Sequence, residues 1–109
     1  MRAPDLLPLK PADFHVLLVL VDGPLHGYAI MKAVERESRG EVRLEIGSLY
    51  RLLGRMVNEG LLEMGKHDGR RRDYALTPLG RRTLKAEAAR LAYLVGRVRA
   101  RRLLPGADV

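Results

Sequence analysis

The chain has 109 residues, enough for one domain, and 47% of them are hydrophobic, which supports an ordinary globular core. It contains no cysteine, which excludes disulfides and thiolate metal sites. The net charge of +7 lies entirely in residues 61–109, where twelve Lys and Arg face five Asp and Glu, while residues 1–60 carry eight of each. A basic half is typical of proteins that bind polyanions, although composition alone is equally compatible with a solvated surface.

No targeting or membrane-spanning segment is apparent in the sequence. The N-terminus lacks the architecture of a signal peptide. The longest apolar stretch, Val16–Val21, is far too short to cross a bilayer. The sequence therefore predicts a soluble, cytoplasmic protein with no membrane partner.

The N-terminal half predicts two helices and a strand. The first helix, Pro11–Asp22, is apolar on every side, which predicts burial both in its own domain and against a second subunit. A turn at Gly23-Pro24 leads to a helix that begins at His26-Gly27 and ends near Ser38, with Tyr28 facing inward. Residues 41–45 alternate polar and apolar side chains, which predicts a short strand.

A third helix and a hairpin follow. The helix should run from Gly47 to Glu59 and stop at Gly60 with a left-handed cap. Strands at 61–66 and 70–76 should join around Asp68-Gly69, which suits a tight turn.

The last helix should start with Thr77 as N-cap and Pro78 in its first turn, and run to about Leu103. The predicted fold is α+β but mainly α: a winged helix-turn-helix with an added C-terminal helix. Residues 1–77 would form the DNA-binding domain, and residues 78–109 the dimerisation helix and tail of the same compact unit.

The third helix has two chemically different faces. Its apolar residues recur at helical spacing and should face the core: Leu49, Leu52, Leu53, Met56 and Val57. The other side carries residue types that reach base edges and phosphates: Ser48, Arg51, Arg55 and Asn58, with Tyr50 on the border. An ordinary surface helix would show nearly the same pattern. Gly54 on the polar face costs ~1 kcal/mol relative to alanine but would admit a close sugar-phosphate backbone.

The hairpin gathers cations around one turn: Lys66, His67, Arg70, Arg71 and Arg72. Cations so close repel one another unless an anion lies among them. Three consecutive arginines suit phosphates or a narrow minor groove. A solvated basic turn is the alternative, but helix and hairpin together are more specific than either alone.

The last helix carries a coiled-coil-like apolar stripe: Leu84, Ala88, Leu91, Val95 and Val98. This stripe, with Phe14 and Leu17 of the first helix, predicts a homodimer interface. Folding of the stripe onto its own domain is the alternative. A membrane-surface role ranks low because the helix has no Trp or Phe.

No enzymatic or metal site is indicated. The three histidines, His15, His26 and His67, share no metal-ligand spacing. There is no nucleophile elbow, glycine-rich phosphate loop or cysteine nucleophile. We therefore expect no cofactor, no metal and no catalysis.

Three stretches resemble the PadR family of bacterial transcriptional regulators, in the family's order and spacing: Gly23–Ile30, Gly47–Leu62 and Arg71–Gly80. The single C-terminal helix is similar to the compact subgroup. The resemblance implies a dimeric winged-helix repressor that binds a palindromic operator, often at its own promoter.

Within this resemblance, Ser48, Tyr50, Arg51 and Arg55 match the family's recognition helix, and Arg70–Arg72 match its wing. Gly54 and Val57 depart from the longer polar residues usual in that helix, so the operator sequence does not carry over.

Some compact members bind flat aromatic or cationic compounds between subunits through a tryptophan. This chain has Leu91 at about that position and no tryptophan, so the sequence does not predict which small molecule, if any, acts as its effector. An apolar cavity lined by Phe14, Leu17, Leu91 and Val95 is the alternative site for a small molecule.

Taken together, the sequence predicts a homodimeric repressor that reads double-stranded DNA. Two alternatives stay open: a basic protein-interaction module and an architectural protein that binds DNA without sequence preference.

Overall fold

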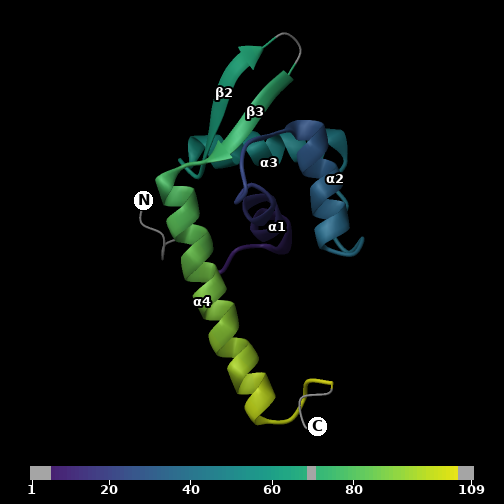
Figure 1. Cartoon of the computed structure of the whole chain (residues 1–109), viewed down its shortest axis with the longest axis vertical. Coiled ribbons are helices and arrows are strands. Elements are labelled where there is room, and N and C mark those ends of the chain that lie inside the picture. The colour runs from purple at the N-terminus through teal and green to yellow at the C-terminus, as the bar shows by residue number, and fades with distance from the viewer. Residues whose placement is uncertain (1–5, 69–70, 106–109) are drawn as a thin grey trace.

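The structure is a computed structural model that describes residues 6–68 and 71–105. Within these residues the elements follow the order α1-β1-α2-α3-β2-β3-α4 (Figure 1). The helices are α1 (Pro11–Val19), α2 (Gly27–Glu37), α3 (Ile46–Asn58) and α4 (Pro78–Ala100). The strands are β1 (Leu25–His26), β2 (Leu62–Asp68) and β3 (Arg71–Leu76). This is the mainly helical winged helix-turn-helix architecture that the sequence predicts.

Local signals in the sequence fix the ends of the helices. Pro11 and Pro78 both occupy the first turn of a helix, where proline has no backbone bond to lose. The Thr77 hydroxyl caps α4 by accepting a hydrogen bond from the Gly80 N–H at 3.0 Å. Gly60 follows α3 with a φ of 80°, a left-handed conformation that glycine adopts without strain. The predicted cap of the third helix is thus confirmed.

The sheet is small and antiparallel, with β3 between β1 and β2. In the hairpin, Leu62 pairs with Leu76 and Met64 with Tyr74; the register is irregular between Met64 and His67. Because side chains alternate along a strand, Leu62 and Tyr74 point into the core. The base of the hairpin therefore belongs to the core, and the rest of the hairpin extends beyond the core as a two-stranded ribbon, which is visible at the top of Figure 1.

Two predictions about strands were wrong. Residues 41–45 form no strand, because alternation reports burial on one side and this segment has no neighbouring strand with which to pair. Its apolar members Val42 and Leu44 still pack against the core. The sheet gains instead the two-residue β1, whose Leu25 pairs with Tyr74. Two residues are too few to produce a periodic signal.

Helix boundaries also moved. The first helix ends at Val19 rather than Asp22, and a turn follows in which Leu20 bonds back to Leu17. The last helix ends at Ala100 instead of Leu103. The first strand of the hairpin starts at Leu62, one residue later than predicted, and extends to Asp68, while the described part of the second strand runs from Arg71 to Leu76.

Side chains from every helix and from β2 and β3 form a single core. Its buried members are Val16, Leu17, Leu20, Ile30, Val34, Leu49, Leu52, Leu53, Met56, Leu61, Leu62, Tyr74 and Leu84. The start of α4 lies directly against the turn after α3, since the Thr77 N–H donates to the Leu61 carbonyl at 3.1 Å. This docking fixes the base of the hairpin relative to α3.

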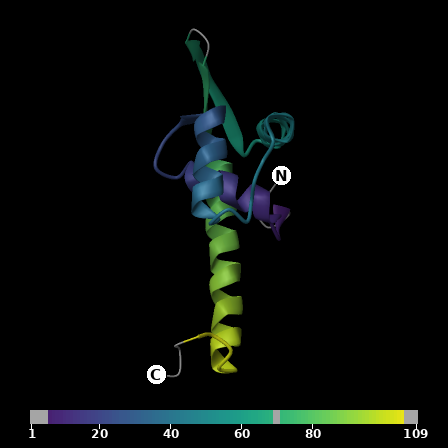
Figure 2. The same ribbon diagram turned by 90° about the vertical axis from the view of Figure 1, so that its right-hand side faces the viewer.

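The second half of α4 leaves the body of the protein. Figures 1 and 2 both show it projecting away from α1, α2 and α3, and the molecule measures 53 × 30 × 22 Å as a result. Tyr93, Leu94 and Val95 are 66%, 43% and 42% exposed on this projecting segment. We refer to residues 92–100 as the α4 arm.

A buried carboxylate ties the N-terminal segment to α4. Glu87 is 1% exposed and accepts hydrogen bonds from the Leu9 N–H at 2.9 Å and from the Arg90 guanidinium at 3.0 Å. The bond from Arg90 is the main reason why the pKa of Glu87 falls below its ordinary value, although burial acts in the opposite direction.

Stability should therefore depend on pH through Glu87. Because its folded pKa is lowered, the carboxylate contributes stability above its ordinary value of 4.5, and this is lost as pH falls through the folded value. We expect Glu87→Gln to lower the free energy of unfolding at neutral pH by about 1.5–3 kcal/mol, the contribution of charged hydrogen bonds. Urea unfolding across pH should show the two proteins converging in acid; a constant difference would contradict this role.

Candidate nucleic-acid interface

Helix α3 presents one face to the core and the other to solvent. Leu49, Leu53 and Met56 are wholly buried, as the apolar periodicity predicts. The solvent face carries Gly47, Tyr50, Arg51, Gly54, Arg55 and Asn58, all exposed. Figure 2 shows α3 almost end-on at one edge of the molecule, beside the base of the hairpin. An elongated partner can therefore approach α3 and the ribbon together.

At the centre of this solvent face, no side chain projects above the helix backbone. Gly47 and Gly54 are seven residues apart, about two helical turns, so they lie on one line of the helix. Apart from the adjacent residues and the helix's own backbone, no described atom comes within 4 Å of a Cβ built on Gly54, and only the Arg51 guanidinium approaches one built on Gly47, at 3.4 Å. Arg51 and Asn58 stand on the same side of the helix. Two polar side chains thus flank a stretch of bare backbone.

Tyr50 and Ser48 lie at the borders of the face. The Tyr50 ring packs on Gly27 so closely that a Cβ at Gly27 would fall 2.5 Å from the tyrosine oxygen. Tyr50 is nevertheless 49% exposed. Ser48 is half-buried, and its hydroxyl accepts a hydrogen bond from the Arg51 guanidinium at 3.2 Å. Both residues can reach a partner only from the edge of the helix.

Arg55 is engaged within the protein. Its Nη2 lies 2.9 and 3.0 Å from the two carboxylate oxygens of Asp13, and its Nη1 lies 3.1 Å from Oε1 of Glu59. The bond to Asp13 is the main reason why the pKa of Arg55 rises above its ordinary value. The side chain of Asp13 is only 11% exposed, whereas that of Arg55 is 45% exposed.

The free energies involved argue against a direct contact between Arg55 and a DNA base. Releasing it would leave the buried Asp13 unpaired, which typically costs about 3–5 kcal/mol. A bidentate contact between arginine and guanine contributes about 1–3 kcal/mol. The structure therefore favours Arg55 remaining on Asp13, and guanine readout by Arg55 stays a prediction that this ion pair opposes.

The wing is described only in part. Arg72 is exposed, and its Nη1 lies 3.5 Å from the Met64 sulfur. Arg70 lies outside the described residues, as do the side chains of Lys66, His67 and Arg71. The backbone register places His67 opposite Arg72 and Asp68 opposite Arg71. Pairing of the strands therefore brings His67, Arg71 and Arg72 to the same end of the ribbon.

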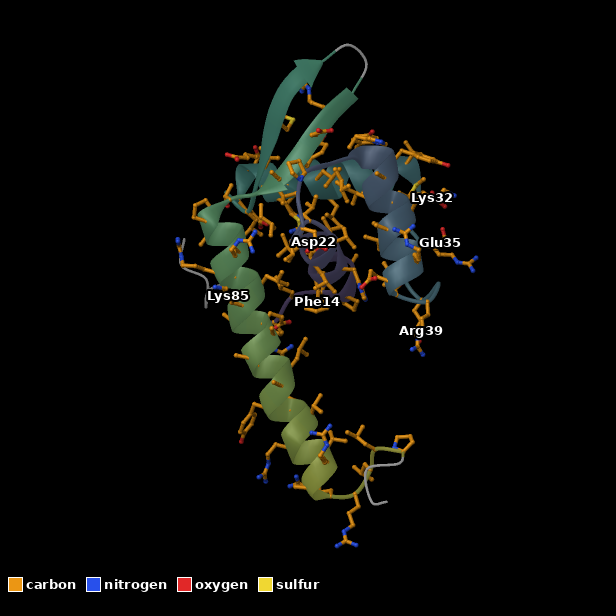
Figure 3. The ribbon with its side chains drawn as sticks, viewed as in Figure 1. Phe14, Asp22, Lys32, Glu35, Arg39 and Lys85 are labelled. Atoms are coloured by element: carbon orange, nitrogen blue, oxygen red, sulfur yellow. The ribbon has the colours of Figure 1, made fainter. Side chains whose placement is uncertain are left out.

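Helix α2 adds two residues that the sequence reasoning missed. Tyr28, predicted to face inward, is 54% exposed, and the Lys32 Nζ lies 5.5 Å from the centre of its ring. Figure 3 shows Lys32 and Glu35 along the outer side of α2, with Arg39 just beyond the end of the helix. In helix-turn-helix proteins the first helix of the motif crosses the phosphate backbone. The sequence contains one indication of this pair: Tyr28 and Lys32 are spaced i, i+4, which places them on the same face of a helix.

The residues predicted for a dimer interface divide into two groups. Leu17 and Leu84 belong to the core of the chain itself, with 0% and 7% exposure, so they have little surface to offer a partner. The remainder are exposed or half-buried: Phe14, Ala88, Leu91, Val95 and Val98. Tyr93 and Leu94 extend this exposed set along the α4 arm and were missed because they lie beside the heptad stripe.

Within residues 6–68 and 71–105, no helix combines the length and apolarity needed to span a bilayer. The same residues contain no group of three or more His, Asp or Glu side chains placed to hold a metal ion.

A family model supports an assignment on independent grounds. The model described as the transcriptional regulator PadR-like family matches residues 16–86, which run from α1 into the first part of α4. The match includes the whole helix-turn-helix and the wing. It ends before the α4 arm.

Individual relatives agree with this match. A 37.1 kDa protein of transposon TN4556 from Streptomyces fradiae is 47% identical over 87 residues, 80% of this chain but only 25% of that protein. The present chain thus spans about a quarter of that relative's length. The structure of H. salinarum RosR aligns with a TM-score of 0.67 and 32% identity, covering 85% of this chain and 80% of that one.

A third comparison extends the similarity of fold. Bacillus subtilis PadR, solved in complex with operator DNA, aligns with a TM-score of 0.62 at 22% identity, covering 71% of this chain and 47% of that one. The fold, the placement of α3 beside the wing and the family match over more than half of the chain lead to one conclusion: this protein belongs to the PadR-like family of transcriptional regulators.

Proposed function

We propose that this protein is a sequence-specific DNA-binding repressor that acts as a homodimer on a palindromic operator, in the cytoplasm and without a cofactor or catalytic step. The observation that carries the proposal is the solvent face of α3, where Arg51 and Asn58 flank the bare backbone at Gly54. Residues 1–77 would bind DNA and residues 78–109 would hold two copies together.

In the proposed complex α3 enters the major groove. Arg51 suits guanine and Asn58 suits adenine, because each can form two hydrogen bonds with that base. Ser48 and Tyr50, at the edges, would bond to bases or backbone. The wing cations would lie on flanking phosphates or in the minor groove: Lys66, His67, Arg70, Arg71 and Arg72. Tyr28 and Lys32 would contact the phosphates on the other side of α3.

The α4 arm is the proposed basis of the dimer. Its exposed apolar side chains would leave water on packing against a second copy, which favours association. The exposed stripe through Leu91, Val95 and Val98, with Phe14, would pack against the same surface of a second copy. A two-fold axis would then place the two α3 helices in successive major grooves, about 34 Å apart.

The relatives support this proposal by analogy. The solved structure of B. subtilis PadR is a complex with operator DNA, and it shares the fold described above. The basic second half of the chain provides the charge that phosphate binding requires.

Selection of duplexes from a random pool tests the function. We expect an enriched palindrome with half-sites about 10–10.5 base pairs apart, centre to centre. Binding without an enriched sequence would favour the architectural protein, and no binding would favour the protein-interaction module. Light scattering at micromolar concentration should give twice the mass of the 12.2 kDa chain, and a monomer would contradict the half-site arrangement.

Replacing one arginine in α3 and one in the wing should distinguish recognition of the base sequence from binding to the phosphate backbone. We expect Arg51→Ala to weaken binding to the selected duplex by about 1–3 kcal/mol and to relax the preference at one base pair. Arg72→Ala should weaken selected and random duplexes alike and reduce the salt slope by about one unit. Titrations at several salt concentrations measure both effects. Equal behaviour of the two variants would contradict this division.

A further inference from the structure

A single guanidinium connects the recognition helix to α1. Asp13 lies in the first turn of α1, and Arg55 lies near the end of α3, 42 residues later in the sequence. Arg55 holds Asp13 through Nη2 and Glu59, on its own helix, through Nη1. No other hydrogen bond to the Asp13 carboxylate occurs among the described residues. The buried acid therefore depends on Arg55.

Apolar packing alone fixes α3 incompletely. Contacts of Leu49, Leu53 and Met56 with the core keep the helix in place, but the hydrophobic effect is not directional. Hydrogen bonds between ions have strict distances and angles, so they fix how a helix is rotated about its axis. One such contact, Arg55 on Asp13, lies near the end of α3, while near its start the Tyr50 ring packs closely on Gly27.

We infer that Asp13 is a positioning residue of the DNA interface. Its buried carboxylate holds Arg55 and thereby fixes the rotation of α3, on which the direction of Arg51 and Asn58 depends. Asp13 does this without touching DNA. The inference rests on the proposed function, because it concerns how accurately that surface meets base edges, where small misplacements weaken a site.

The competing explanation is electrostatic. If Asp13 merely neutralised Arg55, its removal would free a cation for the nearest phosphate. Binding to all duplexes would then tighten, and the salt slope would steepen by about 0.9 for the added phosphate contact. A positioning residue has the opposite signature: discrimination falls while the salt slope stays unchanged.

The test uses Asp13→Asn, which keeps the size of the side chain and removes its charge. Arg55→Lys keeps the charge but loses the planar fork that bonds two carboxylates at once. Glu59→Gln is the matched control, since it removes one negative charge from the same guanidinium and leaves the link to α1 intact. Each full-length variant is titrated with the selected duplex and with a random duplex of equal length, and its thermal midpoint is recorded.

We expect Asp13→Asn to lower the ratio of specific to random affinity by about tenfold, the size of one lost base contact, with an unchanged salt slope. Arg55→Lys, which retains the ion pair with Asp13, should lower the ratio less and should fold even if Asp13→Asn does not. Glu59→Gln should change the ratio by less than about threefold.

Other outcomes would overturn the inference. A lower thermal midpoint with an unchanged affinity ratio in both Asp13→Asn and Arg55→Lys would make the pair merely structural. Tighter binding with a steeper salt slope would make Asp13 a competitor of phosphate. A wild-type protein that does not distinguish the two duplexes would instead refute the proposed function, and that result is visible before any variant is compared.

Discussion

Replacing Gly80 with alanine is expected to destabilise the protein strongly, by about 3 kcal/mol, at the upper end of typical overpacking. A Cβ built on Gly80 would overlap the carbonyl oxygen of Leu61 and lie 3.1 Å from its carbonyl carbon. These are backbone atoms, so no side chain can rotate to relieve the clash. The Leu61 carbonyl also accepts the hydrogen bond from the Thr77 N–H, which holds α4 at the base of the wing.

Urea unfolding measures this loss, and the chain provides its own control. Gly96 also lies within α4, but apart from the adjacent residues and the helix's own backbone, no described atom comes within 4 Å of a Cβ built there. Gly96→Ala should therefore stabilise the protein by about 0.5–1 kcal/mol through helix propensity alone. If Gly80→Ala were as stable as Gly96→Ala, the close packing of α4 on the turn after α3 would be incorrect.

Gly54→Ala is expected to have opposite effects on stability and on DNA binding. In the free protein the added methyl group meets open space, so the helix should gain about 0.5–1 kcal/mol. In the complex the same methyl group would stand where the proposed partner approaches most closely. We expect binding to the selected duplex to weaken by about 10- to 30-fold, or about 1.4–2 kcal/mol.

Because Gly54→Ala should raise stability and lower DNA binding, its effect on binding can be distinguished from a loss of folded protein. A variant that binds DNA less well because it is partly unfolded would lose both properties, whereas Gly54→Ala should be more stable than the wild type. Unaltered binding by Gly54→Ala would show that the DNA backbone stays away from the centre of α3, and the proposed docking would have to change.

Much of the fold was predictable because its signals are local. A helix start at Thr77-Pro78 and a stop at Gly60 each depend on a few consecutive residues, and both are found where predicted. The buried face of α3 follows from apolar spacing within thirteen residues. The strand predicted at 41–45 shows the limit of local signals, because alternation reports burial but not a partner strand.

The candidate site was predictable in outline and not in its details. The sequence identified α3 and the wing as the elements that could bind DNA, but treated every polar residue of α3 as equally available. It placed Tyr28 inward, although that residue is 54% exposed. It also assigned Leu17 to a subunit interface, although the core buries it completely. In both cases the direction of a side chain depends on neighbours from other elements.

By itself the sequence determined the class of this protein: a winged helix-turn-helix with a basic second half, which the match to PadR-like regulators confirms. Periodicity, caps and turn residues act over a few positions and can be read without coordinates. Only the tertiary structure decided which side chains are free. The pairing of Asp13 with Arg55 joins residues 42 positions apart, and no local pattern records such a contact. The fold brings the start of α1 to the end of α3, where Asp13 engages Arg55 and opposes the predicted contact of Arg55 with DNA.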